Sequence, residues 1–242
     1  MDKYLSFEEI QHKCAKLNDV YQIEEAKFYQ VVEMWADRDT STEQKLVASF
    51  QELLQVVSDE ITAMEQAVDL PSTCRMGCAF CCYFPIIINK MEAKLMKKAI
   101  ENFPNQRRQT IQRHLNRYYE KYGEQVEQVT ALDFEADEDF KYKYKQRLVP
   151  CPMLDTETNK CLAYEVRPLP CRTYVNYTDP KVCEENVMPK ETISFEFLYN
   201  EYMGALNEFV QYLYEYEDTA FIEYPNDIYR TDYLAQYAKT FK

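Results

Sequence analysis

Glycine is nearly absent from this chain, with three among 242 residues. Phosphate-cradling loops and dinucleotide-binding folds need glycine at their turns, so the sequence argues against both. Histidine is almost as scarce, with two residues, and this excludes a histidine-rich catalytic zinc site. The serine and histidine residues also show no arrangement typical of a catalytic triad.

Long hydrophobic runs are absent as well. No stretch approaches the roughly 18 apolar residues of a membrane span. The first residues, Met1-Asp2-Lys3-Tyr4, lack the basic and apolar regions of a secretory signal, so we expect a cytoplasmic protein without a membrane partner. Acidic residues outnumber basic ones by 41 to 28, for a net charge of -13. A field of that sign repels phosphate backbones, so we expect no nucleic-acid partner.

Cysteine, in contrast, is abundant and clustered. A first block holds four cysteines within nine residues, and a second holds four more at wider spacing. The two blocks are Cys74, Cys78, Cys81 and Cys82, and Cys151, Cys161, Cys171 and Cys183. A chain of this length folds without needing disulfides, and cytosolic thiols stay reduced. We therefore favour metal ligation over disulfides and take all eight cysteines as candidate metal ligands.

Ligands made only of sulfur suit zinc, copper(I) or iron–sulfur clusters, and they do not suit magnesium or calcium. Structural zinc sites usually use short cysteine pairs, whereas the second block is spaced ten to twelve residues apart. Iron–sulfur clusters accept irregular spacing, so this pattern slightly favours an iron–sulfur cluster over zinc. Adjacent side chains diverge, so Cys81 or Cys82 ligates the metal while its neighbour serves a second metal or stays unligated.

The second block lies in a proline-rich segment, with six of the ten prolines between residues 150 and 189. Proline fixes the φ angle but supplies no core, whereas metal ligation contributes folding free energy directly. We therefore expect one metal site to join the two blocks. Arg167 and Arg172 flank Cys171, and either they anchor the loop through backbone carbonyls, which we prefer, or they donate to cluster sulfur or a substrate carboxylate.

Helical patterns flank this core. Ser6 with Glu9 forms a capping box before an apolar stripe that predicts one long helix as far as Trp35, with Cys14 as a small hydrophobe on the stripe. Thr40 with Glu43 caps a second predicted helix that ends at Leu70. Residues 1–69 therefore read as a helical hairpin that serves as a scaffold or, alternatively, as an arm that binds a protein partner or dimerises.

Further elements are predicted between and beyond the cysteine blocks. An apolar run at 83–88 indicates a buried strand or an extended segment, and Asn89 with Glu92 caps a helix. The next helix covers 105–122 and ends at Gly123. We place four arginines on its exposed face and treat His114 as an ordinary surface residue. These arginines are Arg107, Arg108, Arg113 and Arg117.

The remaining segments complete the predicted organisation. Residues 131–145 read as a solvated loop. Helical periodicity returns from residue 193, and a last short helix is expected over 227–239. The fold class is mainly α, with a helical hairpin (1–69) and C-terminal helices (191–242) around a loop-rich, metal-stabilised cysteine-cluster domain (70–190).

The ordered cysteine pattern resembles a known family. Cys74-x3-Cys78-x2-Cys81-Cys82, Cys151-Pro-x-Leu and Cys161-x2-Tyr-Glu-x-Arg-Pro-x2-Cys171-Arg-x-Tyr are similar to the YkgJ-like cysteine-cluster family over about residues 70–185. Cys183 falls where some members carry a further cysteine. The resemblance implies a zinc- or iron-chelating domain. The family is also similar to flagellin lysine N-methylases, which implies an iron–sulfur cluster and S-adenosylmethionine.

Two classes of function follow from these patterns. The first is a metal-binding module whose centre is structural or redox-sensing. The second is an enzyme, implied by the resemblance, that transfers a methyl group to a protein lysine. The Cys74-x3-Cys78-x2-Cys81 spacing also matches that of radical S-adenosylmethionine enzymes. However, the chain lacks the repeated strand–helix alternation of their barrel.

Overall fold

The computed structural model describes residues 4–217 and 220–242. It is mainly helical, as the sequence predicts, and its strands are two or three residues long. The chain divides into two compact units, each built from two separate stretches. Unit 1 comprises Met1–Arg75 and Leu169–Tyr224, and unit 2 comprises Met76–Pro168 and Pro225–Lys242.

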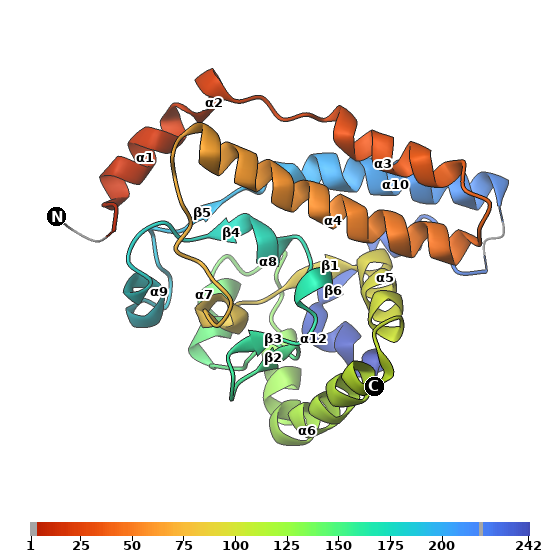
Figure 1. The fold of residues 1–242 in the computed structure, drawn as a ribbon. Coiled ribbons are helices and arrows are strands. Elements are labelled where there is room, and N and C mark those ends of the chain that lie inside the picture. The colour runs from red at the N-terminus through yellow and green to blue at the C-terminus, as the bar shows by residue number, and fades with distance from the viewer. Residues whose placement is uncertain (1–3, 218–219) are drawn as a thin grey trace. The chain divides into compact units, whose positions relative to one another are not determined.

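Three helices form the centre of unit 1: α3 (Ala26–Ala36), α4 (Thr42–Ala67) and α10 (Leu198–Tyr216) lie side by side (Figure 1). Their facing side chains are apolar and almost fully buried. They include Phe28, Val32, Leu46, Phe50, Leu53, Val57, Leu206, Phe209 and Leu213. The second predicted helix and the helical periodicity predicted after residue 193 are therefore confirmed, and both helices turn an apolar face to the core.

The prediction of one continuous helix from Phe7 to Trp35 is wrong. The capping box of Ser6 and Glu9 is present, but α1 (Phe7–Ala15) and α2 (Leu17–Val20) end before α3 begins. Tyr21 takes an extended backbone conformation, and its hydroxyl donates to Glu60 at 2.8 Å. This long-range bond holds the link between α2 and α3 out of the helical path, which apolar spacing alone does not reveal.

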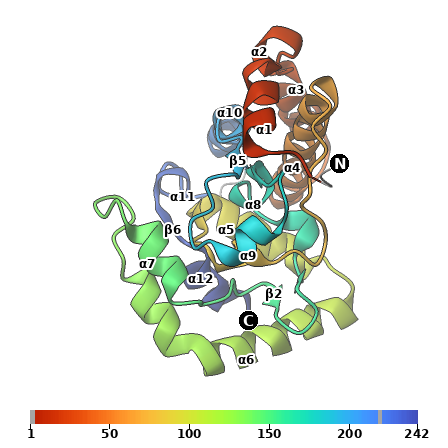
Figure 2. The ribbon, with the colours of Figure 1, turned by 90° about the vertical axis from the view of Figure 1, so that its left-hand side faces the viewer.

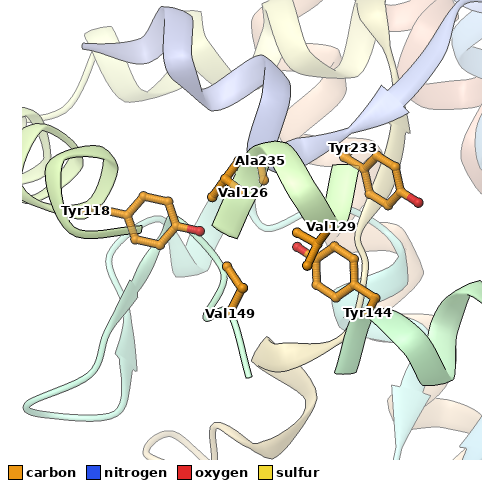
Figure 3. Packing of buried hydrophobic residues seen from close by; sticks show 7 residues of the cluster. All are labelled: Tyr118, Val126, Val129, Tyr144, Val149, Tyr233 and Ala235. Carbon is orange, nitrogen blue, oxygen red and sulfur yellow. The ribbon is translucent and has the colours of Figure 1, made fainter. Parts of the chain in front are cut away.

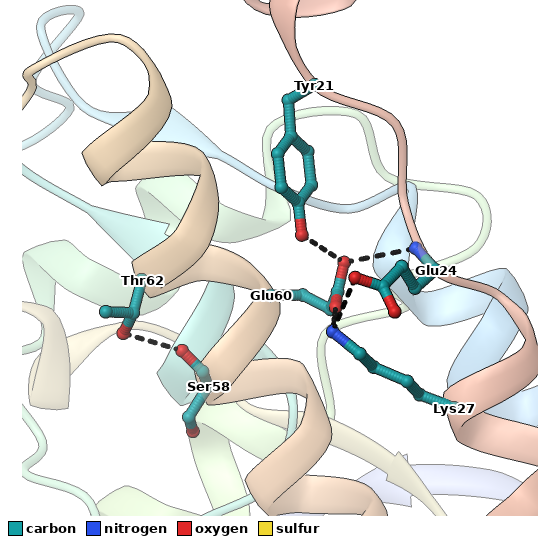
Figure 4. A network of polar contacts seen from close by, with 6 residues as sticks. All are labelled: Tyr21, Glu24, Lys27, Ser58, Glu60 and Thr62. Carbon is teal, nitrogen blue, oxygen red and sulfur yellow. Dashed lines mark hydrogen bonds and ion pairs between the residues drawn. The ribbon is translucent and has the colours of Figure 1, made fainter.

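Glu60 is the centre of a polar network on α4 (Figure 4). Its side chain is fully buried and accepts hydrogen bonds from the Tyr21 hydroxyl, the Glu24 backbone N–H at 3.4 Å and the Lys27 ammonium at 3.0 Å. Burial, followed by the bond to Glu60, raises the pKa of Tyr21 to about 12. The buried carboxylate is thus satisfied by three donors from the segment that precedes and opens α3.

The start of α4 also differs from the prediction. Its cap is Ser41 with Gln44, one residue later than Thr40 with Glu43. Three short elements of unit 1 carry or flank the last two cysteines of the second block, Cys171 and Cys183: α8 (Pro170–Thr173), β4 (Tyr174–Val175) and α9 (Lys181–Glu185). Strand β4 pairs antiparallel with β5 (Ile193–Ser194).

Unit 2 is organised around α5 (Lys90–Glu101) and α6 (Asn105–Thr130). The predicted strand is present as β1 (Ile87–Asn89), which pairs antiparallel with β6 (Thr231–Tyr233). The capping box of Asn89 and Glu92 is also confirmed. A short C-terminal helix, α12 (Leu234–Tyr237), lies against α6 (Figure 2).

Helix α6 does not stop at Gly123 but continues to Thr130. Its last turns carry buried valines that pack with tyrosines from other elements (Figure 3). The cluster comprises Tyr118, Val126, Val129, Tyr144, Val149, Tyr233 and Ala235. Glycine inside a helix costs about 1 kcal/mol relative to alanine, and burial of Val126 and Val129 offsets that cost.

Two further predictions are corrected in unit 2. The supposed loop at 131–145 contains most of α7 (Phe140–Gln146), whose Tyr144 stacks on Tyr233 with ring centroids 5.7 Å apart. The predicted helix at 227–239 is instead α11 (Asn226–Tyr229), β6, α12 and the 3-10 turn η3 (Ala238–Phe241). Pairing of β6 with β1 explains the interruption, because it needs extended backbone. No helix in the described part of the chain is long and apolar enough to cross a bilayer.

Candidate metal centre

Unit 2 brings cysteines of both blocks together. Cys81 and Cys82 lie in the 3-10 turn η1 (Phe80–Tyr83), and Cys161 lies in β3 (Lys160–Cys161). The backbone N–H of Cys151 donates to the carbonyl of Cys82 at 2.7 Å. Residues 69 positions apart in the sequence are therefore joined directly at this point.

The sulfur atoms of Cys151 and Cys161 accept hydrogen bonds from nearby backbone amides. Backbone hydrogen bonds from Met153 to Cys151 and from Ala163 to Cys161 lower the pKa of these thiols, and the Leu154 N–H donates to the carbonyl of Cys151 at 2.9 Å. These turns belong to a hairpin in which β2 (Leu154–Asp155) pairs with β3. Amide donors of this kind stabilise the charged form of a thiol, which is the form that ligates metals.

Burial opposes ionisation at the same two residues. It raises the pKa of Cys151 to about 12 and raises the pKa of Cys161 less strongly. In both cases the backbone donors act in the opposite direction. Without a cation the two thiols are therefore protonated at neutral pH, and a bound metal would displace their protons.

Cys81 differs from both. Its pKa is lowered to about 7, chiefly by a hydrogen bond with Cys82 and, against the effect of burial, by the positive charges of Arg167 and Lys145. The Arg167 guanidinium lies 4.1 Å from the centre of the Tyr164 ring, and the Lys145 ammonium lies 4.1 Å from that of Phe84. Two cations held on aromatic faces thus favour a thiolate at Cys81.

The two arginines that flank Cys171 in the sequence have different environments. Arg167 is close enough to Cys81 and Cys161 to lower the pKa of each thiol, which fits a role beside the sulfurs. Arg172 is buried in unit 1 and donates to the Ser58 hydroxyl of α4 at 2.7 Å. Arg172 therefore fits the anchoring role, through a side chain of α4.

The other cysteines are half-buried as well, except for Cys74. Cys78 is half-buried and follows Gly77, whose φ of +96° suits glycine in the turn of the first block. Unit 1 carries Cys74, Cys171 in α8 and Cys183 in α9. Cys74 is exposed, and its sulfur accepts the backbone N–H of Asn176 at 3.3 Å. Cys14 is half-buried in α1, where burial raises its pKa.

Three residues of α6 contact the cysteine-bearing hairpin, and sequence reasoning gave none of them this role. His114 was expected on the surface, but it is half-buried and its Nε2 lies 3.0 Å from the carbonyl oxygen of Pro152. Arg107 and Tyr118 contact the same segment. Their spacing of seven and four residues places them on one helix face, but spacing alone does not reveal what that face contacts.

The cysteine side chains are of the type that binds metals with a preference for sulfur, but they are not arranged around one point. In residues 4–217 and 220–242, no three histidine, cysteine, aspartate or glutamate side chains are grouped so that they could hold an ion. The same residues include no disulfide. Sulfur-only donors with amide hydrogen bonds suit zinc or iron, and the sulfurs would draw together when the metal binds.

Comparison with known proteins agrees with this chemistry. A family model described as "CxxCxxCC: Putative zinc- or iron-chelating domain" matches residues 73–192. The matched segment contains all eight cysteines of the two blocks. No curated protein and no solved structure matches the chain.

Proposed function

Because the chain belongs, through residues 73–192, to the CxxCxxCC family of zinc- or iron-chelating domains, we propose that a thiolate-ligated metal centre forms on unit 2. The observation that carries the proposal is the shared environment of Cys81, Cys151 and Cys161. Two of these sulfurs accept backbone N–H groups, and the third has a lowered pKa beside two cations. The lowered pKa favours a thiolate at Cys81, whereas at Cys151 and Cys161 the backbone hydrogen bonds act toward the thiolate against the larger effect of burial.

The proposal assigns a role to each cysteine of the two blocks. Cys81, Cys151 and Cys161 are ligands, and Cys78 is the fourth, since its turn belongs to the same unit. Cys82 supports Cys81 through their side-chain hydrogen bond. Cys74, Cys171 and Cys183 belong to unit 1 and remain candidate metal ligands there.

An iron–sulfur cluster is the preferred occupant, and zinc is the alternative. Four thiolates at irregular spacing suit a cluster, and Arg167 and Lys145 offset part of their negative charge. When bound, a cluster would supply one-electron chemistry, whereas zinc would supply a structural cross-link. In either case the role of the chain is to hold thiolates, donate amide hydrogens to them and provide nearby positive charge.

Purification without oxygen, followed by iron, sulfide and zinc analysis with an ultraviolet–visible spectrum, tests the proposal. A brown protein that contains iron and sulfide supports a cluster, and a colourless protein with stoichiometric zinc supports a zinc site. Cys151→Ser should remove the metal, whereas Cys14→Ser, which changes a cysteine outside the matched segment, should retain it. A wild-type protein with neither metal, even after reconstitution, would overturn the proposal.

The methylase alternative is tested on the same metal-loaded sample. The similarity of the family to flagellin lysine N-methylases implies binding of S-adenosylmethionine. Calorimetric titration with S-adenosylmethionine should detect saturable binding if the alternative holds. Its absence, with the metal retained, favours a structural or redox-sensing module.

A further inference from the structure

Helix α6 donates hydrogen bonds to the cysteine-bearing hairpin at three points. The Tyr118 hydroxyl donates to the carbonyl of Pro150 at 2.7 Å. The His114 Nε2 lies 3.0 Å from the carbonyl oxygen of Pro152, so this nitrogen carries the hydrogen. The Arg107 Nη2 donates to the carbonyl of Leu162 at 2.8 Å.

These three acceptors directly adjoin the two proposed ligands. Pro150 and Pro152 stand on either side of Cys151, and Leu162 follows Cys161. A proline has no N–H to donate, so its carbonyl is the only polar backbone group through which a neighbour can hold it. Hydrogen bonds to these carbonyls therefore restrict the backbone that carries both sulfurs.

The three donor side chains are carried by one long helix. Arg107, His114 and Tyr118 share one face of a 26-residue helix. Tyr118 is buried within the cluster that also includes Val126 and Val129, while Arg107 pairs with Glu165 of the 3-10 turn η2 (Tyr164–Val166). The hairpin thus has anchors in α6 that do not depend on a metal.

We propose that α6 is the positioning element of the metal centre, which holds Cys151 and Cys161 in place before the metal arrives and thereby raises metal affinity. This inference rests on the proposed function. Ligands that are already ordered lose less conformational entropy on binding. Cys78 and Cys81, which belong to the same unit, then supply the remaining proposed ligands.

The Tyr118→Phe variant tests this role against a matched control, Tyr119→Phe. Tyr119 is the next residue of α6, and its hydroxyl also donates to a backbone carbonyl, that of Ala235, at 2.8 Å. Only the acceptor of Tyr118 adjoins a proposed ligand. Tyr118→Phe should weaken zinc or cobalt(II) binding by about tenfold or more, as loss of an outer partner of a metal ligand does.

Competition with a chromophoric chelator measures the affinity, and the charge-transfer band of the cobalt(II) form reports thiolate geometry. Tyr118→Phe should shift that band, whereas Tyr119→Phe should leave both affinity and band unchanged. A second pair, His114→Gln and His114→Leu, keeps or removes the N–H donor toward Pro152, so Gln should retain more affinity than Leu.

The outcomes separate the two hypotheses. Equal metal affinity and an unchanged cobalt band in all four variants would overturn the positioning role while leaving the metal centre intact. Equal losses in Tyr118→Phe and Tyr119→Phe would also overturn it, because the effect would then reflect general stability. A wild-type protein that binds neither zinc, cobalt nor iron would refute the proposed function itself.

Discussion

Cys81 and Cys82 are neighbours in the sequence with different surroundings in the structure. The charge of Cys81 contributes to the raised pKa of Cys151, and the positive charges of Arg167 and Lys145 lower the pKa of Cys81. Cys82 contacts Cys151 through its backbone carbonyl and Cys81 through its side chain. Sequence reasoning left open which of the two is the ligand, and these contacts favour Cys81.

Serine substitutions at these two positions should therefore have unequal effects. Cys81→Ser should abolish metal binding because it removes a thiolate ligand. Cys82→Ser should retain the metal, with affinity lowered by about tenfold, because a hydroxyl can still donate to Cys81. Metal content after purification and chelator competition measure both effects, and a result with the two variants reversed would identify Cys82 as the ligand.

Metal affinity should rise with pH because each ligand thiol must lose its proton before it can bind the metal. The pKa of Cys81 is about 7, while burial raises the pKa values of Cys151 and Cys161 above the ordinary range. The metal must displace the protons of the latter two throughout the neutral range, so affinity should increase by about tenfold per pH unit for each displaced proton. Below pH 7, protonation of Cys81 steepens this dependence.

Zinc titrations at several pH values, in buffers of different ionisation enthalpy, count the protons released. Release of at least two protons just above pH 7 would fit ligation by Cys151 and Cys161, whose pKa values are raised. An affinity that is independent of pH would show that these thiols are not ligands.

At the scale of single elements, Glu60 supports the turn between α2 and α3. Glu60→Gln keeps the shape but removes the charge, and its amide would face the Lys27 ammonium. We expect a loss of about 1–3 kcal/mol in the free energy of unfolding, with the smaller part from the half-exposed Lys27. Urea unfolding followed by circular dichroism measures it.

Asp59→Asn is the matched control for this substitution. Asp59 is the preceding residue of α4, and it accepts an exposed hydrogen bond from Gln55 at 2.7 Å. The control should stay within about 0.5 kcal/mol of the wild type. Equal effects of the two variants would show that the Glu60 network does not stabilise the α2–α3 link.

Local signals predicted elements well where the partners are near in sequence. The capping boxes at Ser6 and Asn89 need only three residues each, and both are present. The errors in helix boundaries arose where the boundary depends on a partner far away in the sequence. Tyr21 bonds to Glu60, 39 residues away, and α6 passes through Gly123 because its last turns pack on Tyr144 and Tyr233. No window of sequence contains both members of such contacts.

At the scale of the whole molecule, the ligand types could be predicted but their surroundings could not. Eight clustered cysteines predict a sulfur-ligated metal, and the family match supports that chemistry. The backbone donors at Cys151 depend on the hairpin turn, and the α6 contacts join residues 107–118 to 150–162. The sequence also gave no sign that the eight cysteines are carried by two compact units.

This division leads to a final prediction about chelation. The core of α3, α4 and α10 is apolar and contains no candidate ligand, so its amide hydrogen exchange should not change when the metal is removed. Exchange should increase at residues 76–84 of unit 2, because this segment carries the proposed ligands Cys78 and Cys81. The hairpin at 150–162 should change less, since α6 holds it independently.

The response of residues 170–185 to chelation tests whether unit 1 also binds a metal. If Cys171 and Cys183 ligate a metal, as the sequence leads us to expect, chelation should also increase exchange around these two residues. Cys78→Ser and Cys171→Ser should then each abolish metal binding and raise protease sensitivity across 146–190. If Cys171→Ser lowers the metal content without affecting exchange at 76–84, the two units hold separate metals. Retained metal and unchanged protease resistance in both variants would contradict ligation by either cysteine.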